Sequence, residues 1–278
     1  MTEQGIHNRR SFEAQGTNFL KANIGESAFD YAANRPPHSY GLSGTVLTVA
    51  LGTRAVRIRH QFSDTEVTWE MLDGPEKGHH GTAPYEAFEL ARGIFFVSFL
   101  ARDSESVAMT ADLGTGAVTV ILGRIVEGDI VSEVLGGRIE GAGYVGTPPR
   151  HPPFSLGGTR FLNEYAHNVA YEHIYLTDVY ETWLGVRGPQ AGQADTEEYH
   201  SFKVADGVYI VYWNEKVLTA QMTFLFNFLD GECVGQVFAI VEGQRVHSTI
   251  GAHTHLIHSK LSELPNVTWL DVYTGGEA

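Results

Sequence analysis

The chain has 278 residues, of which 43% are hydrophobic and 19% charged, and its formal net charge is −14. This composition is that of a soluble globular protein able to bury a core, in one large domain or two ordinary ones. The acidic balance, with no Lys/Arg-rich run, disfavours nucleic acid and anionic membranes as partners. A single cysteine, Cys233, excludes an internal disulfide framework and a thiolate zinc cluster.

The chain begins with a polar stretch, MTEQGIHNRRSFEAQG, that has no apolar signal-peptide core, and no run approaches the length of a membrane span. We therefore expect a cytoplasmic protein. Helical character is confined to residues 10–32 and, more weakly, 259–264. Residues 1–40 are expected to form an N-terminal extension that packs on the first structural unit.

Short runs rich in Val, Ile and Phe then follow, separated by turn signals such as Asp73-Gly74-Pro75. In a first unit, residues 41–145, we expect strands at 55–61, 93–100 and 117–122. A Pro-rich stretch at residues 146–154, GTPPRHPPF, reads as a stiff extended linker. In a second unit, residues 155–278, we expect strands at 170–176, 207–213, 221–228 and 235–241.

The two units are copies of one another. When the sequence is shifted by 114 residues, fifteen of the 58 ungapped pairs from Leu42 to Phe99 are identical, whereas chance gives roughly four. Thr68-Trp69 falls on Thr182-Trp183, and Gly74-Pro75 falls on Gly188-Pro189. Many short strands in each copy predict an all-β protein made of two antiparallel barrels or sandwiches.

Alternation along the strands of the second copy suggests a site. It places Tyr171, His173 and Tyr175 on one face of a strand, and it places Trp213 and Glu215 on one face of another. If both faces point inward, a carboxylate lies inside an apolar wall, where its pKa rises and it serves as a general acid or base. The alternative is that the tyrosines face outward and Glu215 is a solvated charge in a turn.

The second copy resembles the phenolic acid decarboxylases, small calycin-type barrels that act on hydroxycinnamic acids without a cofactor. The resemblance rests mainly on the string Gly207 to Glu215, GVYIVYWNE, whose last residue corresponds to the family's essential glutamate. One of the family's paired tyrosines matches Tyr165, whereas the other position holds Asn163. Gln193 stands in place of the family's arginine.

The whole chain, over residues 40–275, also resembles the MoaF family, which is built from two calycin-like units. The resemblance implies two tandem calycin (lipocalin-like) antiparallel β-barrels from an internal duplication. No Gly-rich phosphate loop or cysteine cluster accompanies it.

These resemblances imply a cofactor-independent lyase, specifically a dehydratase of a small 4-hydroxyphenyl compound such as a phenolic amino alcohol. The implied catalytic residues are Glu215 as acid/base, Tyr165 and Tyr171 to orient the phenol or the leaving group, and His173 as proton shuttle. The implied substrate-binding residues are Trp183, Trp213 and Tyr175.

Two other functions stay open, a non-catalytic lipocalin-like binder of a small aromatic ligand and a phenolic acid decarboxylase. The expected partner is a small phenolic or aromatic ligand, with no cofactor, no metal, no nucleic acid and no membrane, and a homodimer is left open.

Three histidines near the C-terminus raise the question of a metal. In a strand, His253 and His255 share a face while His258 falls on the other, so at most two meet one ion. We therefore expect His253 and His255 either to line the pocket or to face solvent.

The first copy lacks the polar residues that suggest a site in the second copy. Ala101 stands where the second copy has Glu215, and its first strand carries Arg57, Arg59 and His60 in place of tyrosines. We expect a structural partner, with an anion-binding Arg/His face as the alternative.

Overall fold

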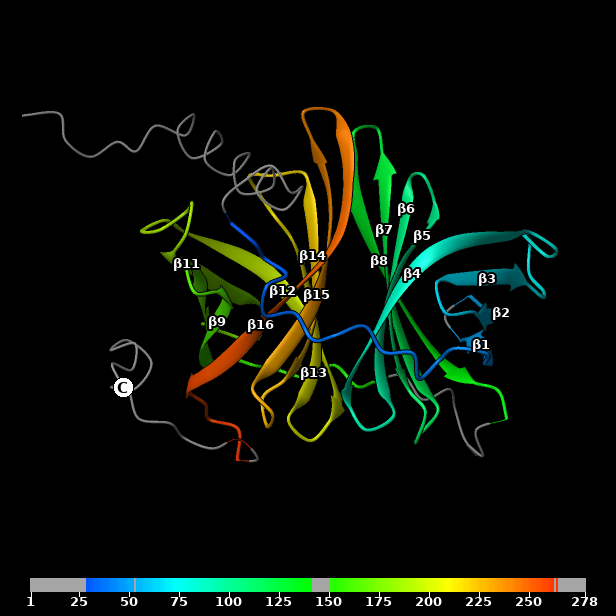
Figure 1. Cartoon of the computed structure of the whole chain (residues 1–278), viewed down its shortest axis with the longest axis horizontal. Helices are drawn as coiled ribbons and strands as arrows, with labels where there is room; N and C mark the ends of the chain where they lie inside the picture. The colour runs from blue at the N-terminus through cyan, green and yellow to red at the C-terminus, as the bar shows by residue number, and fades with distance from the viewer. Residues whose placement is uncertain (1–28, 53, 142–150, 263, 265–278) are drawn as a thin grey trace, which may run out of the picture.

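The computed structural model describes residues 29–52, 54–141, 151–262 and 264, which form two closed antiparallel β-barrels standing side by side (Figure 1). Within these residues the regular elements are all strands, and no helix is long and apolar enough to cross a membrane. The expectation of an all-β protein with two tandem calycin-like barrels is therefore confirmed.

Each barrel is a meander in which strands adjacent in sequence pair, and its first and last strands pair to close the ring. The first barrel consists of β1 (Val46–Leu51), β2 (Val56–Phe62), β3 (Glu66–Met71), β4 (His80–Ala91), β5 (Ile94–Arg102), β6 (Glu105–Asp112), β7 (Ala117–Val126) and β8 (Asp129–Ile139). The second consists of β9 (Arg160–Ala166), β10 (Val169–Tyr175), β11 (Tyr180–Arg187), β12 (Ala194–Ala205), β13 (Val208–Asn214), β14 (Ala220–Asn227), β15 (Glu232–Val241) and β16 (Gln244–His258).

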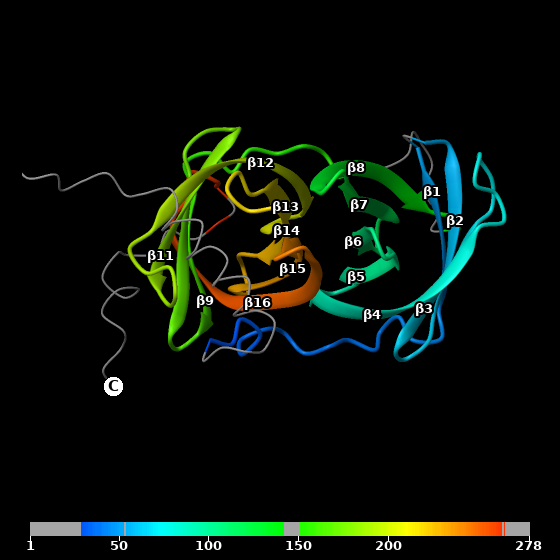
Figure 2. The ribbon, with the colours of Figure 1, turned by 90° about the horizontal axis from the view of Figure 1, so that it is seen from above.

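One wall of each barrel is buried on both faces. The outer faces of β4–β7 and β13–β15 pack against each other between the two rings (Figure 2), with Phe96, Ile121, Ile210, Leu225 and Val234 fully or almost fully buried in that contact. Burial on both faces explains why segment 94–100, IFFVSFL, reads as an almost continuous apolar run, and why Gln221, Thr223 and Asn227 of β14 are buried although they are polar.

Polar side chains add specific bonds across this contact. Ser98 donates to the Gln236 side-chain oxygen at 2.7 Å, and the Asn227 amide donates to the Leu90 carbonyl at 2.6 Å. Gly123 lets the walls approach, because a Cβ there would lie 2.6 Å from the Gln221 side-chain oxygen of the other barrel. The two barrels are therefore fixed to each other by a dry, close-packed surface.

The N-terminal segment runs along both barrels (Figure 2). Tyr31 and Asn34 exchange backbone hydrogen bonds with Gly251 and Tyr165 of the second barrel, whereas Leu42 lies in the core of the first. The described part of the extension contacts the first unit, as expected, through the bond from the Ser39 N–H to the Ala87 carbonyl, and it contacts the second unit as well. Residues 31–34 form a turn and no helix is present at 259–262, contrary to the helical character expected there. The remaining helical expectation, at residues 10–28, lies outside the described residues.

The predicted linker is described only from His151 onward. His151 is buried and bonds Thr119 of the first barrel at 2.8 Å, while the Pro152 carbonyl accepts from Lys203 of the second. This part of the linker therefore packs on both barrels.

The inter-barrel contact predicts a difference between two leucines of the second barrel. Leu225→Ala, in the buried wall, is expected to lower the free energy of unfolding by about 2–5 kcal/mol through lost burial and a residual cavity. Leu176→Ala, at a position more than half exposed, is expected to change it by less than about 0.5 kcal/mol. Urea denaturation measures the free energy of unfolding of both variants. An equal loss in the two would contradict the packing described.

Candidate functional site

A small cavity opens inside the second barrel, with a volume of about 30 Å³. That space holds about one water molecule. The described residues that line it are Tyr165, Tyr171, His173, Trp183, Gln190, Trp213, Glu215, Leu218, Met222 and Phe224. Six of the residues singled out from the sequence as catalytic or substrate-binding thus converge on one cavity.

Strand alternation explains the convergence. Tyr171 and His173 are two residues apart on β10 and point inward, and Trp183 on β11 lies directly opposite His173 in the register. The ring of Trp213 on β13 lies 5.8 Å from that of His173, measured between centroids. The inward orientation of these strands, which the sequence left open, is the one that builds a site.

Glu215 follows the end of β13, and its side chain reaches back to the cavity. The Trp213 indole N–H donates to the Glu215 carboxylate at 2.8 Å, and the Glu215 backbone N–H donates to the Ala220 carbonyl at 2.9 Å. Burial raises the pKa of Glu215 to about 7, although the bond from Trp213 acts in the opposite direction. A carboxyl of this kind can both donate and accept a proton near neutral pH.

Two further carboxyls lie inside the barrel beside this one. Glu181 on β11 and Glu197 on β12 are directly opposite in the register, and both are fully buried. The Glu181 carboxylate lies 3.1 Å from Nδ1 of His173. Burial first, and then the charges of Glu215 and Asp195, raise the pKa of Glu197 to about 9.

Sequence reasoning missed both glutamates, although a signal for each was available. Glu181 precedes Trp183 by two residues, and Glu197 precedes Tyr199 by two, so each shares a strand face with an inward aromatic residue.

A third tyrosine from outside the barrel covers the pair that was predicted. The hydroxyl of Tyr31 lies 3.0 Å from that of Tyr171, which donates in turn to the Gln190 side-chain oxygen at 3.1 Å. The rings of Tyr31 and Tyr165 lie 5.6 Å apart between centroids. Burial raises the pKa of Tyr31, Tyr165 and Tyr171, so their hydroxyls stay protonated and act as hydrogen-bonding groups.

Three predicted substrate-binding residues lie elsewhere. Tyr175 is buried deeper in the barrel against Tyr199, with ring centroids 4.6 Å apart, and does not line the cavity. His253 and His255 are exposed, because the inward positions of β16 belong to Thr254 and Leu256. The expectation that these histidines line the pocket is therefore wrong.

The remaining C-terminal histidine, His258, is exposed too. A bulge between Leu256 and His258 turns His258 outward as well. Among the residues described, no group of three or more His, Cys, Asp or Glu side chains is placed to hold a metal ion. The expectation of chemistry without a metal or cofactor stays a prediction.

Both barrels match models of the same protein family. The model of the MoaF N-terminal domain matches residues 22–127, and that of the MoaF C-terminal domain matches residues 151–260. The chain belongs to the MoaF family. The N-terminal domain of this MoaF-family chain includes Tyr31, and its C-terminal domain includes every residue that lines the small cavity.

Individual relatives are more distant. Protein MoaF of Klebsiella aerogenes is 28% identical over 173 residues, a match that covers 55% of this chain and 66% of that protein. A crystal structure from Burkholderia vietnamiensis, named as a "putative beta-lactamase", is 16% identical, with a TM-score of 0.32, over 38% of this chain and 98% of its own. A Helicobacter pylori beta clamp in complex with 5-chloroisatin gives 8% identity and a TM-score of 0.15, over 89% of this chain and 62% of its own.

The buried glutamates of this MoaF-family chain predict how its stability depends on pH. A carboxyl whose pKa is raised on folding stabilises the protein fully below its unfolded-state pKa, and this contribution is lost as the pH rises through the folded value. His60, His151 and His247, with pKa lowered to about 4, act in the opposite sense only up to pH 6.5. Above pH 7, stability is therefore expected to keep falling until folded Glu197 ionises at about pH 9, because the unfolded chain has already released this proton.

Glu197→Gln is expected to flatten this fall between pH 7 and pH 9 by up to about 1.4 kcal/mol per pH unit. Glu198→Gln, its exposed neighbour on β12, is the matched control and is expected to leave the slope unchanged. Urea unfolding across this range provides the measurement. Parallel curves for Glu197→Gln and the natural protein would contradict the burial of an ionisable carboxyl.

Proposed function

We propose that the second barrel is the site of a cofactor-independent lyase, a dehydratase of a small 4-hydroxyphenyl compound such as a phenolic amino alcohol. The observation that supports this most is the position of Glu215, a carboxyl that titrates near neutral pH at the edge of a cavity bearing tyrosine hydroxyls and a buried imidazole. Such a set suits proton transfer to and from a phenolic substrate.

The reaction begins when the substrate phenol gives its proton to His173, whose imidazole is held by Glu181. Electron density then moves through the ring and breaks the benzylic C–O bond, while protonated Glu215 supplies the proton with which the hydroxyl leaves as water. This step forms a quinone methide.

Glu215, now a carboxylate, removes a proton from the carbon beside the benzylic position, and the phenol oxygen regains the proton held by His173. The net change is loss of one water and formation of an enamine. The enamine tautomerises to an imine, which adds water to give an aldehyde and an ammonium ion.

The surrounding residues suit the two ends of such a substrate. Tyr165 and Tyr171, kept protonated by burial, orient the phenol or the leaving group through hydrogen bonds. The indole rings of Trp183 and Trp213 form the aromatic wall, and a substrate ammonium group is attracted to aromatic faces and to the nearby carboxylates.

The lining disfavours a carboxylate substrate and therefore the decarboxylase alternative. None of the described residues that line the small cavity is Lys or Arg, so no cationic side chain there pairs with a substrate carboxylate. Asn163, at the position of the decarboxylases' second tyrosine, is buried and accepts a bond from Thr254 at 2.9 Å. Its side-chain oxygen is therefore engaged within the barrel wall, whereas its amide nitrogen has no hydrogen-bond partner among the described residues.

Binding of any aromatic substrate requires this cavity to enlarge from its volume of about 30 Å³. Tyr31 lies against Tyr165 and Tyr171 on a segment outside the barrel. Displacement of its side chain uncovers both hydroxyls without breaking the strand ladder.

Removal of the acid/base group gives the first test. With 4-(2-amino-1-hydroxyethyl)phenol as substrate, Glu215→Gln is expected to lower kcat by about 10²–10⁴-fold, because general acid–base catalysis is lost. The control variant Glu198→Gln changes an exposed glutamate on β12 and is expected to keep the natural rate. Trapped aldehyde product, followed by mass spectrometry, measures turnover, and circular dichroism checks the fold.

Two further arms make the test specific. The analogue lacking the para-hydroxyl is expected to give no product, since no quinone methide can form. The rate is expected to fall as the pH rises above 7, because protonated Glu215 is the acid. Binding of the phenol with unchanged ligand mass would instead make the barrel a carrier, and natural activity in Glu215→Gln would refute the mechanism.

A further inference from the structure

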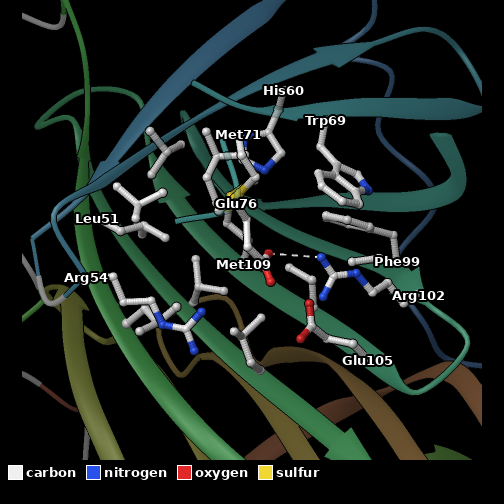
Figure 3. A pocket seen from close by; sticks show the side chains of 18 of the residues that line it. Leu51, Arg54, His60, Trp69, Met71, Glu76, Phe99, Arg102, Glu105 and Met109 are labelled. Carbon is white, nitrogen blue, oxygen red and sulfur yellow. Dashed lines mark hydrogen bonds and ion pairs between the residues drawn. The ribbon is translucent and has the colours of Figure 1, made fainter. Parts of the chain in front are cut away.

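The larger of the two barrel cavities lies in the first barrel, which the sequence assigned a structural role. Its volume is about 380 Å³, more than ten times that of the cavity in the second barrel and within the range of small-molecule sites. Figure 3 shows apolar side chains such as Leu51, Met71, Phe99 and Met109 around it, with charged groups toward one side.

The two cavities occupy equivalent places. His60 is directly opposite Trp69 in the register of β2 and β3, just as His173 is directly opposite Trp183 in β10 and β11. Both histidine–tryptophan pairs line their cavities. The strand registers, counted from this shared pair, give the equivalent positions of the two barrels. Tyr165 and Tyr171 correspond to Leu51 and Ile58. Glu181, Glu197 and Glu215 correspond to Val67, Ala83 and Ala101.

These replacements explain the difference in volume. Tyrosines and glutamates fill the second barrel, whereas smaller or apolar residues at the same positions leave the first one hollow. The retained histidine–tryptophan pair then faces open space instead of a packed polar cluster.

The polar atoms of this pair lie within the barrel wall. Nδ1 of His60 and the indole nitrogen of Trp69 have almost no accessible surface and no hydrogen-bond partner among the described residues, so neither presents a hydrogen-bonding group to the cavity. Burial lowers the pKa of His60 to about 4, which leaves its imidazole neutral at pH 7.

The position of Trp69 depends on a glycine. A Cβ at Gly81 on β4 would lie 2.8 Å from the indole ring, so the ring rests against bare backbone. Asp195 takes the place of Gly81 in the second barrel, by the register of Trp183. The first barrel is thus shaped to hold the indole flat at the wall of its cavity.

The charged groups of the lining compensate one another. Arg102 pairs with Glu76 at 3.0 Å, as drawn in Figure 3, Arg124 pairs with Glu105 at 2.6 Å, and Arg54 pairs with Glu133. Arg57 and Arg59 are directed outward, where they pair with Asp73 and Glu70, so the anion-binding Arg/His face considered from the sequence is not formed. No uncompensated charge of the described lining is therefore offered to an ionic ligand.

We propose that the first barrel is a second ligand-binding site, which takes a small, neutral, largely apolar molecule. Its apolar body fills the space left by the missing tyrosines and glutamates, against Leu51, Met71 and Met109. This site is independent of catalysis in the second barrel.

The test uses 2-naphthol as probe with the full chain, measured by calorimetry and by the probe's own fluorescence. The natural protein is expected to bind it, and to bind naphthalene, which is equally apolar, as well. It is expected to bind 2-naphthoate less tightly, because the carboxylate brings a charge that no unpaired cation of the described lining compensates.

A matched pair of variants locates the site. Val107→Phe fills the first cavity, and Met222→Phe makes a comparable change at the equivalent position of the second barrel, since each residue is opposite the aromatic residue of the preceding strand. Val107→Phe is expected to weaken 2-naphthol binding at least tenfold, and Met222→Phe to leave it unchanged.

Three results would overturn the proposal. These are no 2-naphthol binding by the folded natural protein, loss of binding in Met222→Phe but not in Val107→Phe, or tighter binding of 2-naphthoate than of 2-naphthol. If Val107→Phe does not fold, the contrast between 2-naphthol and 2-naphthoate in the natural protein and in Met222→Phe still decides. Glu215→Gln is expected to bind 2-naphthol normally, so failure of the lyase proposal leaves this one standing.

Discussion

Closure of eight strands into a ring fixes the interior that each barrel must fill, and the rest of this molecule follows from how it is filled. In the second barrel, tyrosines, glutamates and tryptophans occupy nearly all of that space and leave about 30 Å³. In the first, Ile58 and Ala101 stand where the second has Tyr171 and Glu215, and about 380 Å³ stays open. The duplicated frame is the same, whereas its inner side chains have diverged toward two different environments.

Filling a barrel with carboxyls has an electrostatic cost, because burial disfavours their charged form and each one adds to the repulsion on the others. The second barrel reduces this cost by placing a hydrogen-bonding partner beside two of the carboxyls and by keeping the third protonated. Glu181 is held beside the His173 imidazole, and Glu215 receives the indole N–H of Trp213, while Glu197 retains its proton to a higher pH. Clusters that shift a carboxyl toward neutrality in this manner are typical of catalytic sites, although structural networks also shift pKa values.

The sequence predicted the duplication, most of the strands and six residues of the small cavity, because strand periodicity and the repeat are local signals. It did not decide which face of each strand points inward, since alternation gives two equivalent answers until the ring closes. For β16 the inward face belongs to Thr254 and Leu256, so His253 and His255 are outside. Once the inward position of Trp183 is known, Glu181 follows from alternation alone, two residues earlier on the same strand.

Features that arise from contacts between distant segments had no local signal. Tyr31 reaches Tyr171 across 140 residues of sequence, and the outer wall shared by the barrels joins β4–β7 to β13–β15. That shared wall places both faces of these strands in contact with other side chains, which restricts substitutions on them more than on the free walls. Two of the pairs that distinguish the cavities, Tyr171 against Ile58 and Glu181 against Val67, lie on β2, β3, β10 and β11, away from this wall. Two others, Glu197 against Ala83 and Glu215 against Ala101, involve positions on or beside the wall strands β4, β5 and β13. Because strand alternation turns inner side chains away from the shared outer face, both interiors could diverge while the contact that holds the rings together was kept.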